Sequence, residues 1–297
     1  MTQRPRLAQI LAGSVAAILT AVVVATPIGA QISGPTDGQL TILQVSSPSA
    51  LNRINAYRTR AGVPPATADS ALMQSAAGHV AYYDLNRSDP SLAGMGLHDE
   101  RADAPGFTGV GIGERARAAG YASAAVTENA GFGGLEAAIE WHMNTVNHRL
   151  PLIHPSALDM GMAASEGSGF NVIQVGLRRG PASATLPSVY PPDGAGNVPT
   201  SWDGSEAPDP APGIRRPLGY PLTVAFDVSQ RVEWRSVELR NAAGDLIEIS
   251  TPRKEWMRSL AIIPHSPFET NQTYSATIEA VADGRTVTRT WSFTTAG

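Results

Sequence analysis

The spacing of the apolar residues changes once along this chain, and that change limits the fold more than any other feature of the sequence. In the first half, apolar side chains recur mainly at helical spacing, whereas beyond residue 221 they alternate with polar ones. The first pattern is typical of amphipathic helices and the second of half-buried strands. Residues 181–221, which are dense in Pro, Gly, Asp and Ser, separate the two patterns. We therefore expect two domains of different class.

Helix and strand signals both occur in the first region. Ser47 followed by Pro48 is typical of a helix start, and Asp69 is placed to be the N-cap of a second helix. Helices that precede a small sheet indicate an α/β or α+β domain with the helices packed on the sheet. Further helices are expected at residues 114–119 and 135–146, and strands at residues 160–164 and 170–177.

Strand signals alone fill the second region. Asp283-Gly284 lies between two alternating runs and strongly favours a tight hairpin. Several short strands separated by turns are typical of a β-sandwich of about a hundred residues. The expected strands cover residues 222–228, 236–240, 246–249, 273–281 and 286–294.

Composition excludes several classes of function. The chain has 297 residues, of which 42% are hydrophobic and 16% charged, so it can form packed cores. Its net charge is -4 and it has no basic stripe, so no nucleic-acid partner is expected. It contains no cysteine, which excludes thiol catalysis, disulfides and cysteine-ligated zinc. Any metal site must therefore use His, Asp, Glu and backbone oxygens.

Residues 1–30 have the layout of an export signal. Two arginines precede an uncharged apolar run over residues 7–25, and Pro27 with the small residues 28–30 follows. Pro27 and the small residues after it are typical of a cleavage site, which favours a signal peptide that is removed. The alternative is an uncleaved membrane anchor, because the apolar run is almost long enough to span the hydrocarbon core of a bilayer. In both cases we expect a secreted or extracellular protein, with contact to a membrane only through this segment if it is not cleaved. Residues 31–46 are expected to form a linker.

Polar side chains interrupt the apolar pattern of the first region at four places. His and Glu among them are the residues that a cysteine-free metal site would use, and imidazole with carboxylate suits Zn²⁺ or a similar ion. The spacing adds no support, because no His-Glu-x-x-His occurs. The alternative is a polar cluster that hydrogen-bonds loop backbone. The four stretches are residues 97–100, 127–129, 141–144 and 147–149.

Taken in order, these stretches resemble the bacterial branch of the CAP superfamily, the fold of cysteine-rich secretory proteins, antigen 5 and group 1 plant pathogenesis-related proteins. The resemblance covers about residues 47–180 and implies a CAP domain, an α-β-α sandwich with a central cleft. It rests on the sequence and spacing of Asn55-Ala-Tyr-Arg58, His98, Arg115, Gly120-Tyr121, Glu128-Asn129, Trp141, His148-Arg149, Pro155 and Gly161.

The resemblance also implies the residues of the site. The cleft of the family often carries two His and two Glu, and His98, Glu128 and His148 match three of them. The second Glu, three residues after the Trp, is Asn144 here, which weakens any mechanism that needs two carboxylates. The implied ligand cleft is thus His98, Glu128, Asn144 and His148, and the implied ligands of a divalent metal such as zinc are His98, Glu128 and His148.

The C-terminal region resembles the bacterial immunoglobulin-like domains that are appended to surface proteins. The similar segments are residues 190–199 and 291–295. They move the expected start of the second domain to residue 186, so that an immunoglobulin-like β-sandwich would cover residues 186–297. Such modules are usually spacers or adhesion units.

Three functions fit these residues. The leading hypothesis is a secreted or cell-surface binding module of the cell envelope, whose cleft takes a divalent metal, an apolar molecule such as a lipid, or another envelope component. The first alternative is a metal-dependent hydrolase or peptidase in which His98 and His148 hold the ion and Glu128 is a ligand or a catalytic general base. The second is a structural or adhesion protein with a vestigial cleft. Enzyme activity is left open.

Overall fold

The structure, a computed structural model, describes residues 43–45, 48–123, 125–178 and 186–297. The expected export signal, most of the expected linker and the expected N-cap Ser47 lie outside these residues. By its internal contacts, the chain from Thr41 to Gly297 forms one compact unit. Among the described helices, none is long and apolar enough to cross a membrane.

The first region contains both helices and strands. Its helices are α1 (Pro48–Arg60), α2 (Ser70–Asn86), the 3₁₀ turn η1 (Pro90–Leu92), α3 (Ile112–Ala118), α4 (Leu135–Met143) and α5 (Arg149–Ile153). Its strands are β1 (Leu43–Val45), β2 (Thr67–Ala68), β3 (Val126–Phe132), β4 (Ala157–Ser165) and β5 (Phe170–Leu177).

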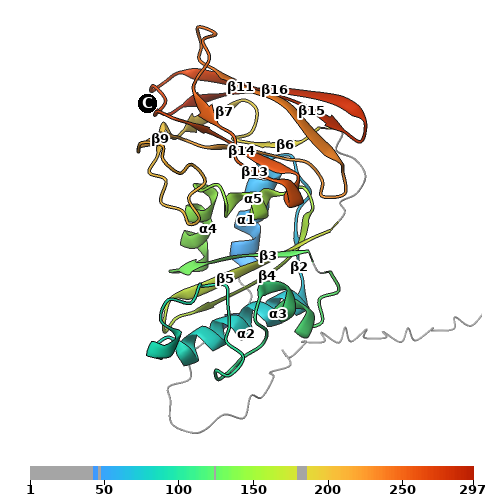
Figure 1. Ribbon diagram of the computed structural model, residues 1–297, viewed down its shortest axis with the longest axis vertical. Helices are drawn as coiled ribbons and strands as arrows, with labels where there is room; N and C mark the ends of the chain where they lie inside the picture. Colours follow the sequence, from blue (N-terminus) through green and yellow to red (C-terminus); the bar gives the residue numbers. More distant parts are fainter. Residues whose placement is uncertain (1–42, 46–47, 124, 179–185) are drawn as a thin grey trace, which may run out of the picture. The chain divides into compact units, whose positions relative to one another are not determined.

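One sheet with helices on both faces forms the first region. The strand order is β1-β4-β5-β3, with β2 paired to β4. Figure 1 shows α2 and α3 on one side of this sheet and α1, α4 and α5 on the other. Because successive side chains of a strand point to opposite faces, Val172 packs with Val80 of α2, whereas Ile173 packs with Ile139 of α4. The sheet is therefore the middle of three layers.

Local signals fix the start of α2 and its distance from the sheet. The Asp69 carboxylate accepts hydrogen bonds from the backbone N–H groups of Ala71 and Leu72, at 2.9 and 3.0 Å, which confirms the predicted N-cap. Gly161 of β4 lies directly beneath this turn. A Cβ atom there would be 2.1 Å from the backbone carbon of Leu72 and 2.2 Å from the amide nitrogen of Met73. Glycine is what allows α2 to lie this close to the strand.

Two expectations for the first region need correction. The helix expected over residues 135–146 ends at Met143, because the backbone amides of residues 146–148 donate to a carboxylate from outside the region and not to carbonyls of a preceding turn. The strand β3 was not predicted at all. Glu128 and Asn129, in its middle, carry polar side chains on both faces and thus hide the strand pattern.

Strands dominate the second region. They are β6 (Ser188–Tyr190), β7 (Ala195–Val198), β8 (Ser201–Trp202), β9 (Leu218–Gly219), β10 (Leu222–Ala225), β11 (Val232–Arg240), β12 (Ile249–Ser250), β13 (Arg253–Lys254), β14 (Ser259–Pro264), β15 (Thr273–Ala282) and β16 (Arg285–Thr295). A 3₁₀ turn, η2 (Glu255–Met257), precedes β14.

The two larger sheets of the second region share a core. One has the order β12-β14-β10-β6 with β13 on β14, and the other has the order β11-β15-β16-β7. Val224 and Ile262 of the first sheet pack with Ile278 and Trp291 of the second. Asp283 and Gly284, with φ of 50° and 80°, form the two-residue turn between β15 and β16, which confirms the predicted hairpin. The all-β class is as expected, while the immunoglobulin-like assignment stays a prediction.

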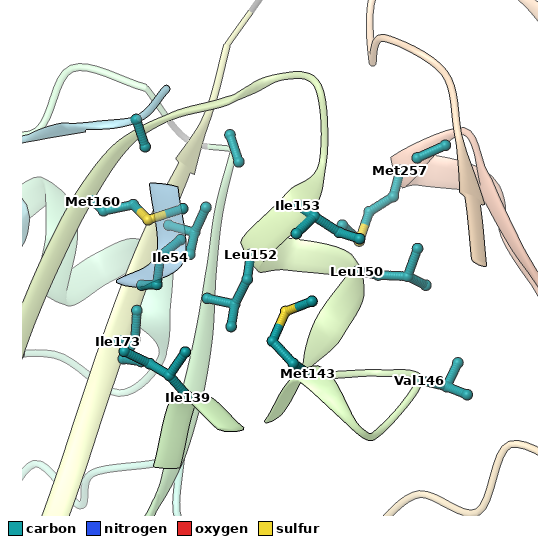
Figure 2. Packing of buried hydrophobic residues seen from close by; sticks show 14 of the residues in the cluster. Ile54, Ile139, Met143, Val146, Leu150, Leu152, Ile153, Met160, Ile173 and Met257 are labelled. Atoms are coloured by element: carbon teal, nitrogen blue, oxygen red, sulfur yellow. The ribbon is translucent and has the colours of Figure 1, made fainter. Parts of the chain in front are cut away.

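The sheet that contains β10 and β14 is buried on both faces at these two strands. Every residue of β10 and β14 is buried. Leu260 and Ile262 face the core of the second region, whereas Ala261 and Ile263 belong to a cluster with residues of α4 and α5. Figure 2 shows Met257 of the second region in this cluster with Leu150 and Ile153 of α5. The two regions therefore share one apolar core.

The close contact of Gly161 with α2 predicts a large effect of one added methyl group. Gly161→Ala forces Cβ against backbone atoms that cannot move without shifting α2, so the free energy of unfolding should fall by about 3 kcal/mol, the upper range for overpacking. Urea unfolding measures it. Gly196→Ala is the control, because a Cβ at Gly196 has no atom within 4 Å. Equal stability of the two variants would contradict this account of the α2 contact.

The shared core predicts that the two regions unfold together. Leu218 is fully buried in the cluster that joins them. Leu218→Ala should cost about 3 kcal/mol by the usual range for buried leucine, and it should shift the unfolding of the whole chain. Calorimetry, with tryptophan fluorescence and far-ultraviolet circular dichroism as regional probes, should show one common transition at a lower temperature. A second transition that keeps the wild-type temperature would mean that the regions are independent.

Candidate functional site

The structure brings two of the predicted site residues into direct contact. The Nδ1 atom of His98 lies 3.0 Å from Oε1 of Glu128. Glu128 is on β3 and its side chain has no exposed surface, whereas the His98 side chain is 43% exposed. The pair thus has a buried carboxylate and an imidazole that faces solvent.

Arg115 of α3 holds both members of this pair. Its Nη2 atom donates to both oxygens of Glu128, at 3.0 and 2.9 Å, and its Nη1 atom donates to the backbone carbonyl of His98 at 2.9 Å. Gln174, paired with Glu128 across β5 and β3, donates from Nε2 to the same carboxylate at 2.9 Å. A side chain held by this many charged and neutral donors has little freedom to move.

A second buried carboxylate lies beside the first. Glu100 accepts hydrogen bonds from the amide and hydroxyl of Thr108, at 2.6 and 3.0 Å, and lies 2.8 Å from Nδ1 of His79. The other nitrogen of His79 is 2.8 Å from the carbonyl oxygen of Leu97. Because carboxylates and carbonyls accept only, both bonds form together only when both nitrogens of His79 carry protons. Two carboxylates would then balance one guanidinium and one imidazolium.

The charges around Glu128 keep it ionised although it is buried. Burial alone would raise the pKa of this carboxyl, but the hydrogen bond from His98, the charges of His79 and Arg115 and the hydrogen bond from Gln174 bring its pKa below the ordinary value. Both oxygens already accept hydrogen bonds from these side chains. The geometry therefore gives Glu128 no free lone pair in reach of solvent for the role of general base.

His148 belongs to a different cluster. Its ring lies 5.0 Å from that of Trp141 and 4.9 Å from that of His142, and its Nδ1 atom is 2.8 Å from a carboxylate oxygen of Glu206. Its backbone carbonyl accepts from the side chain of Asn129 at 2.9 Å. Asn129 follows Glu128 on β3, so the two side chains point to opposite faces of the sheet.

Asn144 and His142 lie in the same second cluster. The Tyr220 hydroxyl is 3.1 Å from Oδ1 of Asn144, whose amide nitrogen donates to the Glu140 carbonyl at 3.0 Å. His142 is buried, and neither of its ring nitrogens has a hydrogen-bond partner among the described residues. Burial, together with the nearby His148, lowers the pKa of His142 to about 3, so its ring is neutral at physiological pH.

The four residues of the predicted cleft thus divide into two pairs. His98 and Glu128 are bound by Arg115 of α3, whereas Asn144 follows α4 and His148 precedes α5, on the other side of the sheet. Among the described residues, no three or more His, Cys, Asp or Glu side chains are grouped to hold a metal ion. As placed, the carboxylate of Glu128 is paired with Arg115. A zinc site of His98, Glu128 and His148 stays a prediction.

Several polar residues of these clusters were not expected. His79 lies on α2 and Gln174 on β5. Both have apolar neighbours in the sequence, so the local pattern indicates a core element and not a polar site. Glu100 was within a stretch noted as polar, without a role. Glu206 lies in the segment rich in Pro and Gly, and nothing in its local sequence distinguishes it from a solvated loop residue.

The depressed pKa of Glu128 predicts how stability depends on pH. A carboxylate whose folded pKa is lowered adds stability above its unfolded pKa, near 4.3, and this contribution is lost as the pH falls through the folded pKa. Glu128→Gln should thus lower the free energy of unfolding by about 3 kcal/mol at neutral pH, as for a broken buried ion pair. Urea unfolding as a function of pH should show the gap to wild type narrowing in acid. A difference in unfolding free energy between the variant and wild type that does not change with pH would contradict the prediction. Glu166→Gln, which changes an exposed carboxylate, is the control.

Searches for similar proteins compared the chain with curated proteins, solved structures and family models. No curated protein matches this chain. Among solved structures, the crystal structure of CopC from Methylosinus trichosporium OB3b is 16% identical and covers 37% of this chain and 92% of its own, with a TM-score of 0.27. So low a TM-score supports no conclusion about fold or function.

A family model defines the first region. Residues 51–176 match the model of the cysteine-rich secretory protein family, CAP. The match begins within α1 and ends within β5, and it includes His98, Glu128, Asn144 and His148. The chain therefore contains a CAP domain at residues 51–176.

Proposed function

We propose that this chain is an exported CAP-domain protein that works at the cell envelope as a binding module for a small apolar ligand, such as a single lipid chain. The observation that carries the proposal is a cavity of about 320 Å³ between α2 and the segment 87–99. Export is inferred from residues 1–30 of the sequence alone, and the released and membrane-tethered forms are both compatible with this function.

The lining of the cavity favours an apolar ligand. Its lining includes the aromatic residues Tyr82 and Tyr83 and the apolar residues Leu92, Met95 and Leu97. Its polar part consists of His79, Asn86, Arg87, Ser88, Asp89 and Asp99. Pockets that bind small molecules have mostly apolar and aromatic walls with a few polar groups, and they begin at volumes of about 300 Å³. The volume thus suits a small ligand or part of a longer chain.

The cavity and the His98–Glu128 pair are neighbours. Leu97 and Asp99, on either side of His98, both line the cavity, and so does His79 of the buried charge network. The network holds the segment that forms one wall, because His79 binds the carbonyl of Leu97 and Arg115 that of His98. In this proposal, the buried charges shape the binding site.

The same geometry argues against the hydrolase alternative. Hydrolysis through a bound ion needs a carboxylate in reach of the activated water. The Glu128 carboxylate has no exposed surface and is paired with Arg115. Its placement supports a binding role over a catalytic one.

A fluorescent fatty acid tests the proposal. A dansyl-labelled medium-chain fatty acid should bind the wild-type protein with increased emission, and Leu92→Trp, which fills the cavity, should weaken binding at least tenfold, or about 1.4 kcal/mol. Leu246→Trp, at an exposed position of the second region, is the matched control and should bind like wild type. Equal binding by both variants, or none by wild type, would overturn the proposal.

A parallel titration with zinc alone separates the apolar ligand from the metal. One outcome is that the wild-type protein binds zinc and not the fatty acid, and that each of His98→Ala and His148→Ala abolishes zinc binding. That result would identify the ligand of the cleft as a metal ion and overturn the proposal of an apolar ligand. Zinc binding that is unchanged by both substitutions would place the metal elsewhere on the chain.

A further inference from the structure

A carboxylate from outside the matched CAP segment is buried against the segment that carries His148. Glu206 lies in the loop between β8 and β9, residues 203–217, and its side chain has no exposed surface. It accepts hydrogen bonds from the backbone amides of Val146, Asn147 and His148, at 2.9, 2.6 and 3.1 Å. It also lies 2.8 Å from Nδ1 of His148.

The rest of the loop fixes Glu206 in this place. The Pro208 carbonyl accepts from the side chain of Asn147 at 2.9 Å, and Ala211 is buried in the core shared with α4 and α5. Within the loop, the Arg216 guanidinium donates a hydrogen bond to the Asp209 carboxylate at 2.6 Å. The carboxylate thus belongs to a built contact between the two regions.

The hydrogen bonds at His148 determine where its proton lies. A carboxylate oxygen accepts only, so Nδ1 must donate to Glu206. The second neighbour of Nδ1, the Thr145 hydroxyl at 3.3 Å, gives its own proton to the His142 carbonyl at 2.8 Å and can also only accept from the ring. Both neighbours therefore require a proton on Nδ1.

A proton on Nδ1 leaves Nε2 of the neutral ring with a lone pair. Among the described residues no side chain or backbone group forms a hydrogen bond with this nitrogen, and the His148 side chain keeps 13% of its surface exposed. Trp141 and His142 pack on the ring and fix its plane. The Nδ1 atom of His148 is thus fixed by its hydrogen bonds, whereas its Nε2 atom is available to a ligand.

We propose that Glu206 is a positioning residue for His148, supplied by the second region, which fixes the Nδ1-protonated tautomer and leaves Nε2 as the acceptor for an O–H or N–H group of a ligand. The CAP segment has an amide, Asn144, where the resemblance implies a second carboxylate, and Glu206 brings a carboxylate to the same cluster from about sixty residues further along. This inference goes beyond the proposed function, because it concerns the other face of the sheet and holds whether or not the cavity binds a lipid.

Nuclear magnetic resonance of the full chain labelled with ¹⁵N-histidine tests the tautomer directly. In the neutral ring of wild type, long-range proton–nitrogen spectra should show a protonated Nδ1 and an unprotonated Nε2 for His148. His148→Gln identifies the signals. A neutral ring protonated on Nε2 would overturn the proposal without the need for a further variant.

A matched pair of variants tests the role of the carboxylate. Glu206→Gln should convert the single tautomer of His148 into a mixture, because the amide can donate as well as accept. Glu233→Gln removes a solvent-exposed carboxylate of the same region and should leave the His148 signals unchanged. A His148 tautomer that is the same in Glu206→Gln as in wild type would show that Glu206 does not position it. If Glu206→Gln does not fold, the wild-type spectrum alone decides.

Discussion

Three arginine side chains with no exposed surface hold the CAP domain together in a chain that has no disulfide. Each guanidinium binds at least one backbone carbonyl in a loop or in the last turn of a helix, and such charge-assisted bonds are stronger than bonds between neutral groups. Burial lowers the pKa of Arg58 to about 10, which still leaves it charged at physiological pH. The carbonyl acceptors are Pro64, Leu152 and His154 for Arg58, His98 for Arg115, and Met143 and Pro221 for Arg149.

The candidate site and the contact between the two regions both depend on these arginines. Arg115 joins the His98 segment to Glu128, and so places one wall of the cavity. Arg149 lies between the rings of Tyr190 and Tyr220, with centroids at 4.8 and 4.9 Å, and joins α5 to the second region. A buried cation needs such partners, because an unpaired one would carry a large desolvation cost. The partners therefore fix the arrangement of elements distant in sequence.

Local features of the fold could be predicted from the sequence, and long-range ones could not. Asp69 and Asp283-Gly284 act on their own neighbours, so the start of α2 and the hairpin of β15 and β16 were correct. The resemblance to the CAP family placed His98, Glu128, Asn144 and His148 in one cleft. His98 and Glu128 are in contact, whereas His148 and Asn144 belong to another cluster. The end of α4 depends on Glu206, about sixty residues further along. Its acidic side chain in a loop rich in Pro gives no sign of a buried partner, so neither the end of the helix nor the composition of the His148 cluster followed from local pattern.

The loop between β8 and β9 also changes where this protein can be divided for engineering. A cut near residue 180, where composition changes, would separate Glu206 from the amides of residues 146–148 and leave these donors without their acceptor. A chimera that replaces the second region would have to keep residues 203–217 or provide another carboxylate at the same place. The first region could then be combined with a different second region only if the loop that carries the carboxylate were kept or replaced at the same time.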